Sequence, residues 1–329
     1  MTRNPILAVL HADSSPGADP RPNQELMAPV AERADIRYTT RDGLAEALDG
    51  ADALFLYDFL SDAVPEAWHA AGSLEWLHVA AAGVDPVMFP ELRASDVTVT
   101  NSRGVFDGAI AEYVLGQILS FAKDFPGSLR LQQAETWKHR ESERISGRVA
   151  LIVGTGPIGR AIARLLRAVG MEVRGSGRRA RSNDPDFGTV TTTEELPAQL
   201  AEADYVIAVA PLTEQTRHLF RKDTFAAMKP TARFVNVGRG ELVDTDDLVT
   251  ALADGVVAGA TLDVLETEPL PPGHPLWSMP NVSITPHNSG DVVGWRDSLV
   301  TVFTDNFERW IDRKPLENVV DKTLGYVPS

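Results

Sequence analysis

The stretch VALIVGTGPIGRAIARLLRAVGMEV, residues 149–173, decides the fold of this chain. It begins with an apolar run, Val149 to Val153, that has the length and composition of a buried strand. A glycine-rich turn follows, and then an amphipathic helical pattern that ends at Gly170. A second short strand is expected directly afterwards, at 172–176. We therefore predict a strand–turn–helix–strand unit of a parallel α/β fold.

The turn of this unit contains three glycines in the spacing G-x-G-x-x-G, which in this context is typical of a dinucleotide-binding turn. Gly154 would allow the tight turn, Gly156 the close approach of a pyrophosphate, and Gly159 the close packing of helix against strand. The N-terminus of the helix offers backbone N–H groups to phosphates. We expect cofactor contacts from these glycines and from Pro157 and Ile158 between them. The alternative is a glycine-rich turn that binds nothing.

The end of the following strand indicates which dinucleotide is bound. Units that bind NAD carry an Asp or Glu about 20 residues after the glycines, where it accepts a hydrogen bond from the ribose 2′-hydroxyl. Here the strand ends in Ser176, and Arg178 and Arg179 follow, within the basic stretch VRGSGRRAR (173–181). Arginine can bind a 2′-phosphate through paired, charge-assisted hydrogen bonds, and the serine hydroxyl can add a donor. The sequence favours NADP(H) over NAD(H). The alternative is a solvated arginine-rich loop.

The rest of the chain repeats the alternation of short apolar runs and helical patterns, in two series. Two series predict two parallel sheets and two domains, which also suits the length of 329 residues. Long helices are expected at 107–125, ended by Pro126-Gly127, and at 291–312. The strands expected are 6–10, 36–38, 53–57, 74–79 and 97–100 in the first series, and 148–153, 172–176, 205–208, 233–236, 257–260 and 282–284 in the second.

Composition excludes several classes of function. The formal net charge is −15, with 46 acidic against 31 basic residues, which argues against a nucleic-acid-binding protein. The chain has no cysteine, so it has no disulfide, no thiolate nucleophile and no cysteine-ligated metal. No apolar run is long enough for a membrane span and no signal peptide is recognisable, so we expect a cytoplasmic protein. Six of the seven histidines, those at 11, 69, 78, 139, 218 and 274, match no metal-ligand spacing, and no metal is expected.

Five segments together resemble the D-specific 2-hydroxyacid dehydrogenase family, in particular its glyoxylate and hydroxypyruvate reductases, and the resemblance extends from about Leu74 onward. The resemblance implies a Rossmann dinucleotide domain, residues 101–285, inserted into a flavodoxin-like substrate domain formed by 1–100 and 286–329. It also implies a homodimer. The segments are AAGVD (81–85), VIAVAPLTEQTRHLF (206–220), FVNVGRGELVD (234–244), ATLDVLETEPLPPGHPLW (260–277) and NVSITPHNSG (281–290).

This resemblance implies three catalytic residues whose chemistry suits the reduction of a 2-keto acid. Arg239, after an expected strand, has a planar guanidinium that can bind a carboxylate through two hydrogen bonds and polarise a ketone. His287 is the acid/base, since imidazole titrates near neutral pH. Glu268 pairs with this histidine in the family, and the pattern D-V-x-x-x-E-P selects it over its rival Glu266.

The resemblance assigns further contacts around these three residues. Asp263 and the backbone near Val237 are expected to meet the nicotinamide carboxamide. The backbone N–H groups of Gly83 and Val84 are expected to help hold the substrate carboxylate. The adenosine half of the cofactor is expected to lie along Pro211, Leu212 and Thr216. Candidate pocket walls, each of which could equally pack in the core or an interface, are Tyr57, Phe59 and Trp137.

The sequence thus predicts an NAD(P)H-dependent reductase, or D-2-hydroxyacid dehydrogenase, acting on a small 2-keto acid such as glyoxylate, hydroxypyruvate or a substituted pyruvate. The nearest alternative is a 3-phosphoglycerate dehydrogenase, which usually prefers NAD and in many cases carries a regulatory domain that an end at Ser329 leaves no room for. Formate and phosphite dehydrogenases are also relatives. A dinucleotide-sensing transcriptional corepressor has the same fold, but a disordered tail would be expected after the last helix.

Overall fold

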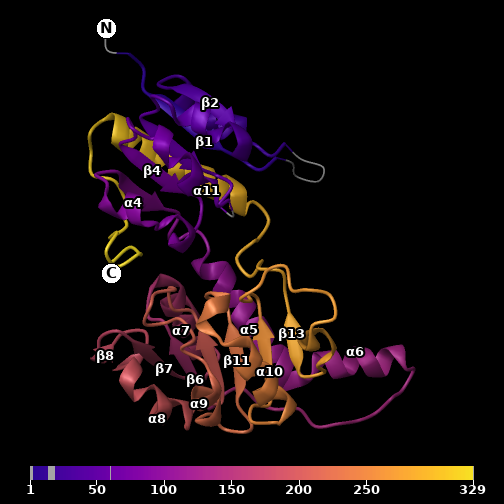
Figure 1. Cartoon of the computed structure of the whole chain (residues 1–329). Helices are drawn as coiled ribbons and strands as arrows, with labels where there is room; N and C mark the ends of the chain where they lie inside the picture. Colours follow the sequence, from indigo (N-terminus) through magenta and orange to yellow (C-terminus); the bar gives the residue numbers. More distant parts are fainter. Residues whose placement is uncertain (1–2, 14–18, 60, 329) are drawn as a thin grey trace. The chain divides into compact units, whose positions relative to one another are not determined.

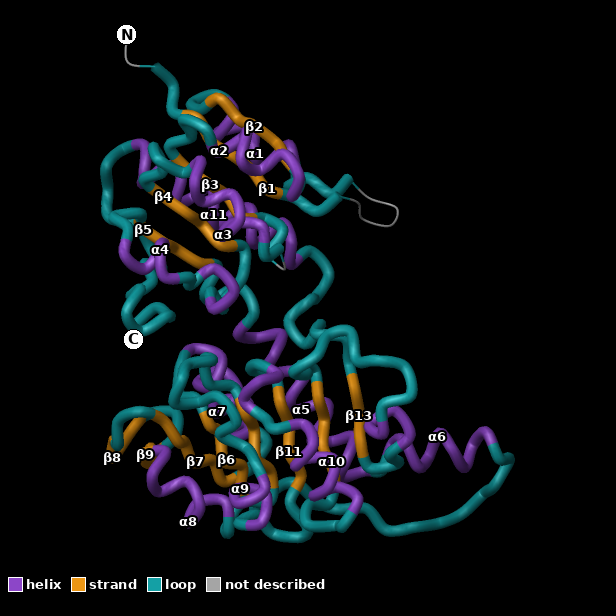
Figure 2. Tube along the Cα trace, viewed as in Figure 1, coloured by secondary structure: helices purple, strands orange, loops and turns teal. Residues whose placement is uncertain are grey.

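The computed structural model describes residues 3–13, 19–59 and 61–328. The chain separates into two compact units, the first formed by Met1–Val105 and Val293–Ser329 and the second by Phe106–Val292. Each unit is built around its own sheet, with helices packed on it (Figures 1 and 2). The prediction of an α/β protein with two sheets is confirmed.

The first unit contains a parallel sheet of five strands in the order β2-β1-β3-β4-β5. This is the strand order of flavodoxin-like folds. All the strands are parallel, and β1 and β3 are almost wholly buried, which explains why they are near-continuous apolar runs, ILAVL and ALFL, whereas β2 (DIRYT) is partly exposed. They are β1 (Ile6–Leu10), β2 (Asp35–Thr39), β3 (Ala53–Leu56), β4 (Trp76–Val79) and β5 (Thr98–Asn101).

The helices of this unit are α1 (Gln24–Ala31), α2 (Leu44–Leu48), α3 (Ala63–Ala67), α4 (Pro90–Ala94) and α11 (Trp295–Ile311), with 3-10 turns at Arg41–Gly43, Trp68–Ala70 and Asp85–Val87. The last helix is fixed to the sheet by Phe303. Its ring stacks on Phe55 at 3.9 Å between centroids and on Trp76 at 5.4 Å. The helix begins at Trp295 and not at residue 291 as expected, because Gly294 precedes it with a left-handed φ of 85°.

The second unit contains a sheet of eight strands in the order β13-β12-β11-β10-β6-β7-β9-β8. All neighbours are parallel except β8, which runs antiparallel to β9 at the edge. From β9 to β12 the order is that of the doubly wound Rossmann fold. The strands are β6 (Val149–Val153), β7 (Glu172–Gly177), β8 (Arg181–Asp184), β9 (Gly188–Thr192), β10 (Tyr205–Ala208), β11 (Arg233–Asn236), β12 (Gly259–Leu262) and β13 (Val282–Ile284).

The helices of the second unit are α5 (Asp107–Lys123), α6 (Phe125–Gln133), α7 (Pro157–Ala168), α8 (Leu196–Leu200), α9 (Lys222–Ala226) and α10 (Thr245–Ala253), with 3-10 turns at Thr193–Glu195, Gly240–Leu242 and Pro275–Ser278. Apolar residues of α8, α9 and α10 pack with those of β6, β10 and β11 in one buried cluster. Helix α5 packs against α7, and its Gln117 accepts a hydrogen bond from Thr261 of β12 at 3.3 Å.

Two expectations for this unit were wrong. No strand was expected between 177 and 205, where β8 and β9 form a hairpin. The long helix ends at Lys123 and not at 125, because Asp124 adopts a left-handed φ of 47°. Its carboxylate then accepts the N–H of Gly127 and caps α6, which projects from the body of the unit (Figure 2). Over the described part of the chain, no helix combines the length and apolar character that a membrane crossing requires.

Candidate active site

The glycine turn lies at the carboxyl end of β6, and its three glycines lie in different local surroundings. Gly154 has φ of 118°, and a Cβ there would lie 2.5 Å from backbone atoms of Val209 and Ala210. A Cβ on Gly159 would lie 2.0 Å from the carbonyl oxygen of Gly154. A Cβ on Gly156 would have nothing within 4 Å.

Gly156 is also the N-cap of α7, and as a glycine it has no side chain to cap the N–H groups of that first turn. Pro157 and Ile158 form this first turn and are half-buried. An open glycine beside uncapped N–H groups at a helix N-terminus is the arrangement that a pyrophosphate requires. The residues present therefore fit the phosphates of a dinucleotide.

The arginines of the basic stretch 173–181, which begins within β7, have different partners. Arg174 forms an ion pair with Glu202, and Arg181 bonds to Asp184 and Thr155. Arg178 and Arg179 are exposed just beyond the strand end. Ser176 is fully buried, and its hydroxyl has no hydrogen-bond partner among the described residues.

The loop after β10 also lies at this edge of the sheet, because β10 is the parallel neighbour of β6. Pro211 is exposed and Leu212 is half-buried at its start. The hydroxyl of Thr216 donates to the carbonyl of Pro211 at 2.7 Å and accepts the N–H of Thr213 at 2.8 Å. Thr216 therefore fixes the turn that carries the other two predicted residues.

Arg239 follows β11, the next strand of the sheet. The buried side chain of Asn236 holds its loop, because it accepts the N–H of Gly238 at 3.1 Å and donates to the carbonyl of Arg239 at 2.9 Å. A Cβ on Gly240 would lie 2.0 Å from the backbone of Leu265. The arginine loop therefore packs directly on the segment that contains the predicted glutamate.

A hydrogen bond joins Glu268 and His287, with 2.9 Å between Oε2 and Nδ1. The other carboxylate oxygen accepts the N–H of Leu265 at 2.8 Å. Burial of this carboxyl opposes ionisation, but the hydrogen bonds from His287 and Leu265 outweigh it and hold the pKa of Glu268 below its usual range. With Nδ1 turned to the glutamate, Nε2 is the ring nitrogen that can donate to a substrate.

Glu266 forms a second pair of the same kind with a different histidine. Its Oε1 lies 2.7 Å from Nε2 of His218, and its Oε2 accepts the N–H of Thr245 at 2.8 Å. Burial again opposes ionisation, but these hydrogen bonds keep the pKa of Glu266 below its usual value. The two candidate glutamates therefore contact different histidines, and it is Glu268 that contacts His287. Sequence reasoning missed His218, since its partner lies far along the chain.

Asp263, at the end of β12, holds the backbone of the loop that carries His287. Its carboxylate accepts the hydroxyl of Thr285 at 2.6 Å and the N–H groups of Asn288 and Ser289 at 3.0 and 3.1 Å. Its carbonyl accepts the N–H of His287 at 2.8 Å. These bonds fix the histidine in a left-handed conformation, with φ of 52°.

The remaining predicted residues are divided between the two units. Val237 is buried and donates its N–H to the carbonyl of Ala208. Gly83 and Val84 follow β4 in the first unit. Of the candidate pocket walls, Trp137 is fully exposed after α6.

The other two candidate walls belong to the first unit. Tyr57 is buried beside Phe55, with 5.5 Å between ring centroids. Phe59 contacts Trp295 edge to face at 5.7 Å. Both residues therefore take part in the packing of that unit.

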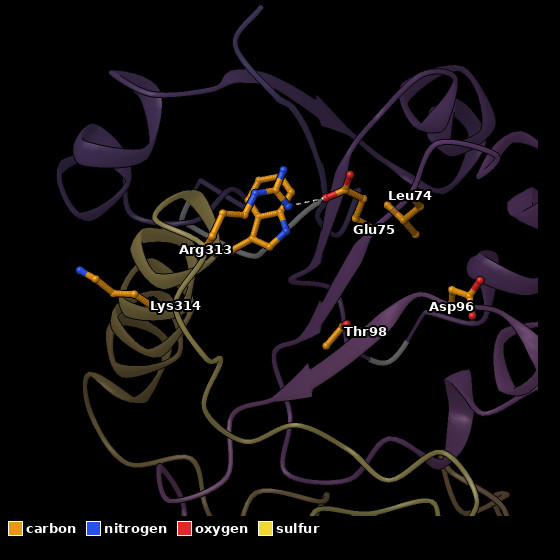
Figure 3. A pocket seen from close by; sticks show the side chains of 7 residues that line it. Leu74, Glu75, Asp96, Thr98, Arg313 and Lys314 are labelled. Carbon is orange, nitrogen blue, oxygen red and sulfur yellow. Dashed lines mark hydrogen bonds and ion pairs between the residues drawn. The ribbon is translucent and has the colours of Figure 1, made fainter. Parts of the chain in front are cut away.

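A hollow in the first unit does not provide comparable chemistry. It lies at the amino ends of β4 and β5, where Glu75 pairs with Arg313 at 3.2 Å (Figure 3). Both signs of charge line it and no histidine does. Sites in parallel α/β sheets form at the opposite, carboxyl ends of the strands. No group of three or more metal-ligating side chains occurs within residues 3–13, 19–59 and 61–328.

A protein-family model described as "D-isomer specific 2-hydroxyacid dehydrogenase, NAD binding domain" matches residues 115–289, which is more than half of the chain. The chain belongs to this family. It is therefore an oxidoreductase with an NAD-binding domain, and the fold class and enzyme class predicted from the sequence are confirmed.

Individual relatives agree with this assignment. The glyoxylate reductase of Thermococcus onnurineus is 32% identical over 284 residues, 83% of this chain and 83% of the relative. The glyoxylate reductase/hydroxypyruvate reductase of Mus musculus is 33% identical over 276 residues, 81% of this chain and 83% of the relative. Among solved structures, the NADPH-dependent glyoxylate/hydroxypyruvate reductase of Sinorhizobium meliloti in complex with NADP and sulfate is 27% identical, with a TM-score of 0.82 over 98% of this chain and 100% of that chain.

Proposed function

We propose that the enzyme reduces a small 2-keto acid to the D-2-hydroxy acid, with NADPH as the preferred reductant and glyoxylate and hydroxypyruvate as the first candidate substrates. The observation that carries this proposal is the Glu268–His287 pair, 2.9 Å apart, in the same unit as the glycine turn and Arg239. The similarity to the glyoxylate reductase of Thermococcus onnurineus and to the glyoxylate/hydroxypyruvate reductases of Mus musculus and Sinorhizobium meliloti supports the choice of substrates.

Three side chains perform the reduction in this proposal. Arg239 binds the substrate carboxylate through its planar fork and polarises the ketone. His287 donates a proton from Nε2 to the carbonyl oxygen as the carbon accepts a hydride, and then recovers a proton from solvent. Glu268 holds Nδ1 and stabilises the protonated ring. When bound, the reduced nicotinamide supplies the hydride. Gly83 and Val84 are proposed to donate backbone N–H groups to the same carboxylate.

The cofactor contacts that we propose follow the carboxyl edge of the second sheet. The glycine turn, with Pro157 and Ile158, binds the pyrophosphate, and the loop of Pro211, Leu212 and Thr216 lies along the adenosine half. Asp263 and the backbone of Val237 meet the nicotinamide carboxamide. Ser176, Arg178 and Arg179 favour the 2′-phosphate of NADPH. The two exposed arginines at the strand end and the NADP in the Sinorhizobium meliloti structure support this preference.

We also propose that the enzyme is a homodimer. Exposed apolar side chains on α6 and the loop after it support this, since Phe125 is 52% exposed, Leu129 59% exposed and Trp137 fully so. Light scattering of the purified protein tests it. A monomer at micromolar concentration would contradict the proposal.

The test of function is oxidation of NADPH and NADH by glyoxylate, hydroxypyruvate, phenylpyruvate and 3-phosphohydroxypyruvate, followed by the absorbance of the reduced nicotinamide. His287→Asn is the decisive variant, because asparagine tolerates the left-handed backbone of this position better than alanine does. We expect turnover to fall about 10²- to 10⁴-fold while cofactor binding is retained. Near-normal turnover in this variant would overturn the assignment of the acid. Turnover of 3-phosphohydroxypyruvate alone would identify a phosphoglycerate dehydrogenase instead.

A further inference from the structure

The basic stretch 173–181, which runs from β7 to the start of β8, contains two arginines that the proposed function does not use. Arg174 is paired with Glu202, and the proposal assigns Arg178 and Arg179 to the cofactor. Arg181 lies beyond them, on the first strand of the β8–β9 hairpin. The register of the sheet and two side-chain hydrogen bonds fix its position.

The hairpin brings Arg181 to the level of the end of β7. Val190 of β9 pairs with Gly175 of β7 on one side and with Arg181 of β8 on the other. Phe187, in the turn of the hairpin, fills the space beside Gly175, where a Cβ would lie 2.9 Å from its ring. The hairpin is therefore packed on the strand end at which such units distinguish the ribose 2′ position.

The guanidinium of Arg181 joins this hairpin to the glycine turn. Its Nε donates to Asp184 at 3.1 Å, and its Nη2 donates to the hydroxyl of Thr155 at 2.9 Å. Thr155 lies between Gly154 and Gly156, and a Cβ on Gly177 would lie 2.9 Å from that same hydroxyl. These two bonds use two of the five N–H donors of the guanidinium. The group is thus held between the pyrophosphate-binding turn and the end of β7.

The carboxylate that holds Arg181 is covered, whereas the arginine is not. The side chain of Asp184 is 2% exposed and that of Arg181 is 36% exposed. Asp184 also binds Arg160 of α7 through both oxygens, at 3.0 and 2.9 Å, and accepts the N–H of Asp186. A phosphate at the strand end would therefore face the cation and not the carboxylate.

The charged side chains around Arg181 are those of Arg160, Arg164, Asp184 and Asp186, and together with Arg181 they carry more positive than negative charge. Asp186 pairs with Arg160 at 2.7 Å and with Arg164 at 3.4 Å. Three guanidinium groups, those of Arg160, Arg164 and Arg181, therefore share two carboxylates. Arg164 is the most exposed of the three at 62%, whereas Arg181, at 36%, is the one that bonds to the glycine turn through Thr155. The fixed position of Arg181 beside that turn reduces the side-chain entropy lost when it binds a further anion.

We propose that Arg181 is a specificity-determining residue that binds the adenosine 2′-phosphate of the cofactor, and that Thr155 and Asp184 are the residues that position it. This rests on the proposed function, in that it takes NADPH to be the preferred cofactor. It adds to Arg178 and Arg179 a third cation that is held in place by the fold.

The test is the binding of two small probes, adenosine 2′,5′-bisphosphate and AMP, measured by titration calorimetry together with NADPH and NADH. The variant is Arg181→Met, which removes the charge and keeps the length of the stem. We expect the affinity for the bisphosphate and for NADPH to fall about tenfold to a hundredfold, the range of one charge-assisted hydrogen bond. The affinity for AMP and NADH should change less than about twofold. An equal loss for all four ligands, or no loss, would overturn the proposal.

Arg174→Met is the matched control, because it makes the same chemical change in the same stretch at a residue paired with Glu202. It should leave the ratio of bisphosphate to AMP affinity unchanged, and an equal fall would reduce the effect to net charge and overturn the proposal. Thr155→Val removes only the hydroxyl that positions Arg181 and should lower the same ratio severalfold. If Arg181→Met fails to fold, an unchanged ratio in Thr155→Val would overturn the proposal.

Binding by the wild-type protein distinguishes a failure of the proposed NADPH preference from a failure of the proposed role of Arg181. If it binds the bisphosphate no more tightly than AMP, then the proposed NADPH preference is wrong and the role of Arg181 falls with it. If it discriminates but Arg181→Met discriminates equally well, only the role of Arg181 is wrong.

Discussion

The same substitution, glycine to alanine, is expected to have opposite consequences at two positions of the glycine turn. In Gly159→Ala the new methyl would lie 2.0 Å from the carbonyl oxygen of Gly154, and real contacts of this kind are not shorter than 3.0 Å. The helix and the glycine turn must therefore separate by at least 1.0 Å, the difference between these two distances. In Gly156→Ala the methyl meets nothing within 4 Å, and the backbone, with φ of −76°, suits alanine.

The magnitudes follow from these contacts. Overpacking costs about 1–3 kcal/mol, and a clash with backbone belongs at the upper end, while alanine returns about 1 kcal/mol of helix propensity. For Gly159→Ala we expect a net loss of about 2 kcal/mol, or about 4–8 °C in the melting temperature of the second unit. For Gly156→Ala we expect a smaller loss of about 1 kcal/mol, or about 2–4 °C, since alanine is a poorer N-cap than glycine but meets no clash. Its cofactor affinity should instead fall about tenfold or more, because the methyl occupies the approach to the pyrophosphate.

The assay combines thermal unfolding of the protein without cofactor with titration of NADPH by fluorescence. The relevant transition is the one that added NADPH shifts to higher temperature, because a ligand stabilises the unit that binds it. If Gly159→Ala melts like the wild type, or if Gly156→Ala binds NADPH as tightly as the wild type, the assignment of separate roles to the two glycines is refuted.

Three further outcomes are expected. Glu268→Gln should lower kcat about tenfold or more, whereas Glu266→Gln should mainly affect stability; equal effects on kcat in steady-state assays would contradict the distinction between the two pairs. Arg239→Lys should raise KM and lower kcat together, because an ammonium cannot reproduce a bidentate fork, and an unchanged kcat would remove its role in polarising the ketone. The hydrogen bond from Arg160 outweighs the effect of burial and holds the pKa of Asp184 well below its usual value, so this carboxylate stabilises the fold above about pH 4 and loses that contribution as the pH falls further. Urea unfolding should therefore show Asp184→Asn less stable than the wild type at pH 7, with a smaller difference at pH 3; a constant difference would argue against the ion pair.

The parts of the fold that local patterns determine were predictable. The strand before the glycine turn, the turn itself and Gly170 at the end of the helix all lie within one stretch, 149–173. Buried parallel strands were equally visible as apolar runs, and the strands at Tyr205–Ala208 and Arg233–Asn236 were predicted with their observed bounds. In each case the signal and the element it predicts lie in the same short segment.

The β8–β9 hairpin could not be found in this way, because its strands are polar and its stability depends on distant residues. Asp184 is buried only because Arg160 of α7 and Arg181 neutralise it. One local signal existed: Pro185, Asp186 and Gly188 are typical of a tight turn between two strands.

The break between α5 and α6 was missed for a related reason. Pro126 indicates the end of a helix in the sequence, although proline is also common in the first turn of one. Asp124 directly before that turn is the N-cap, and its αL conformation, more often adopted by glycine or asparagine, was not expected.

The choice between the two glutamates depended on contacts that no local pattern contains. Glu266 faces His218, whose place beside it is set by the loop after β10. Glu268 faces His287, whose place is set by the bonds of Asp263. Sequence identifies the residue types, but only the packing of three loops on one another decides which histidine each glutamate meets.

The arrangement of these glutamates has a consequence for how the segment can vary in evolution. Glu266 and Glu268 are separated by one exposed residue, Thr267, and each is bound to a different loop. The side chain of Thr267 is therefore free to change, but the number of residues between the glutamates is not. An insertion or deletion of one residue here would break one histidine pair whichever pair it preserved. Homologous enzymes that keep both histidines should tolerate substitutions at this position and no change in length.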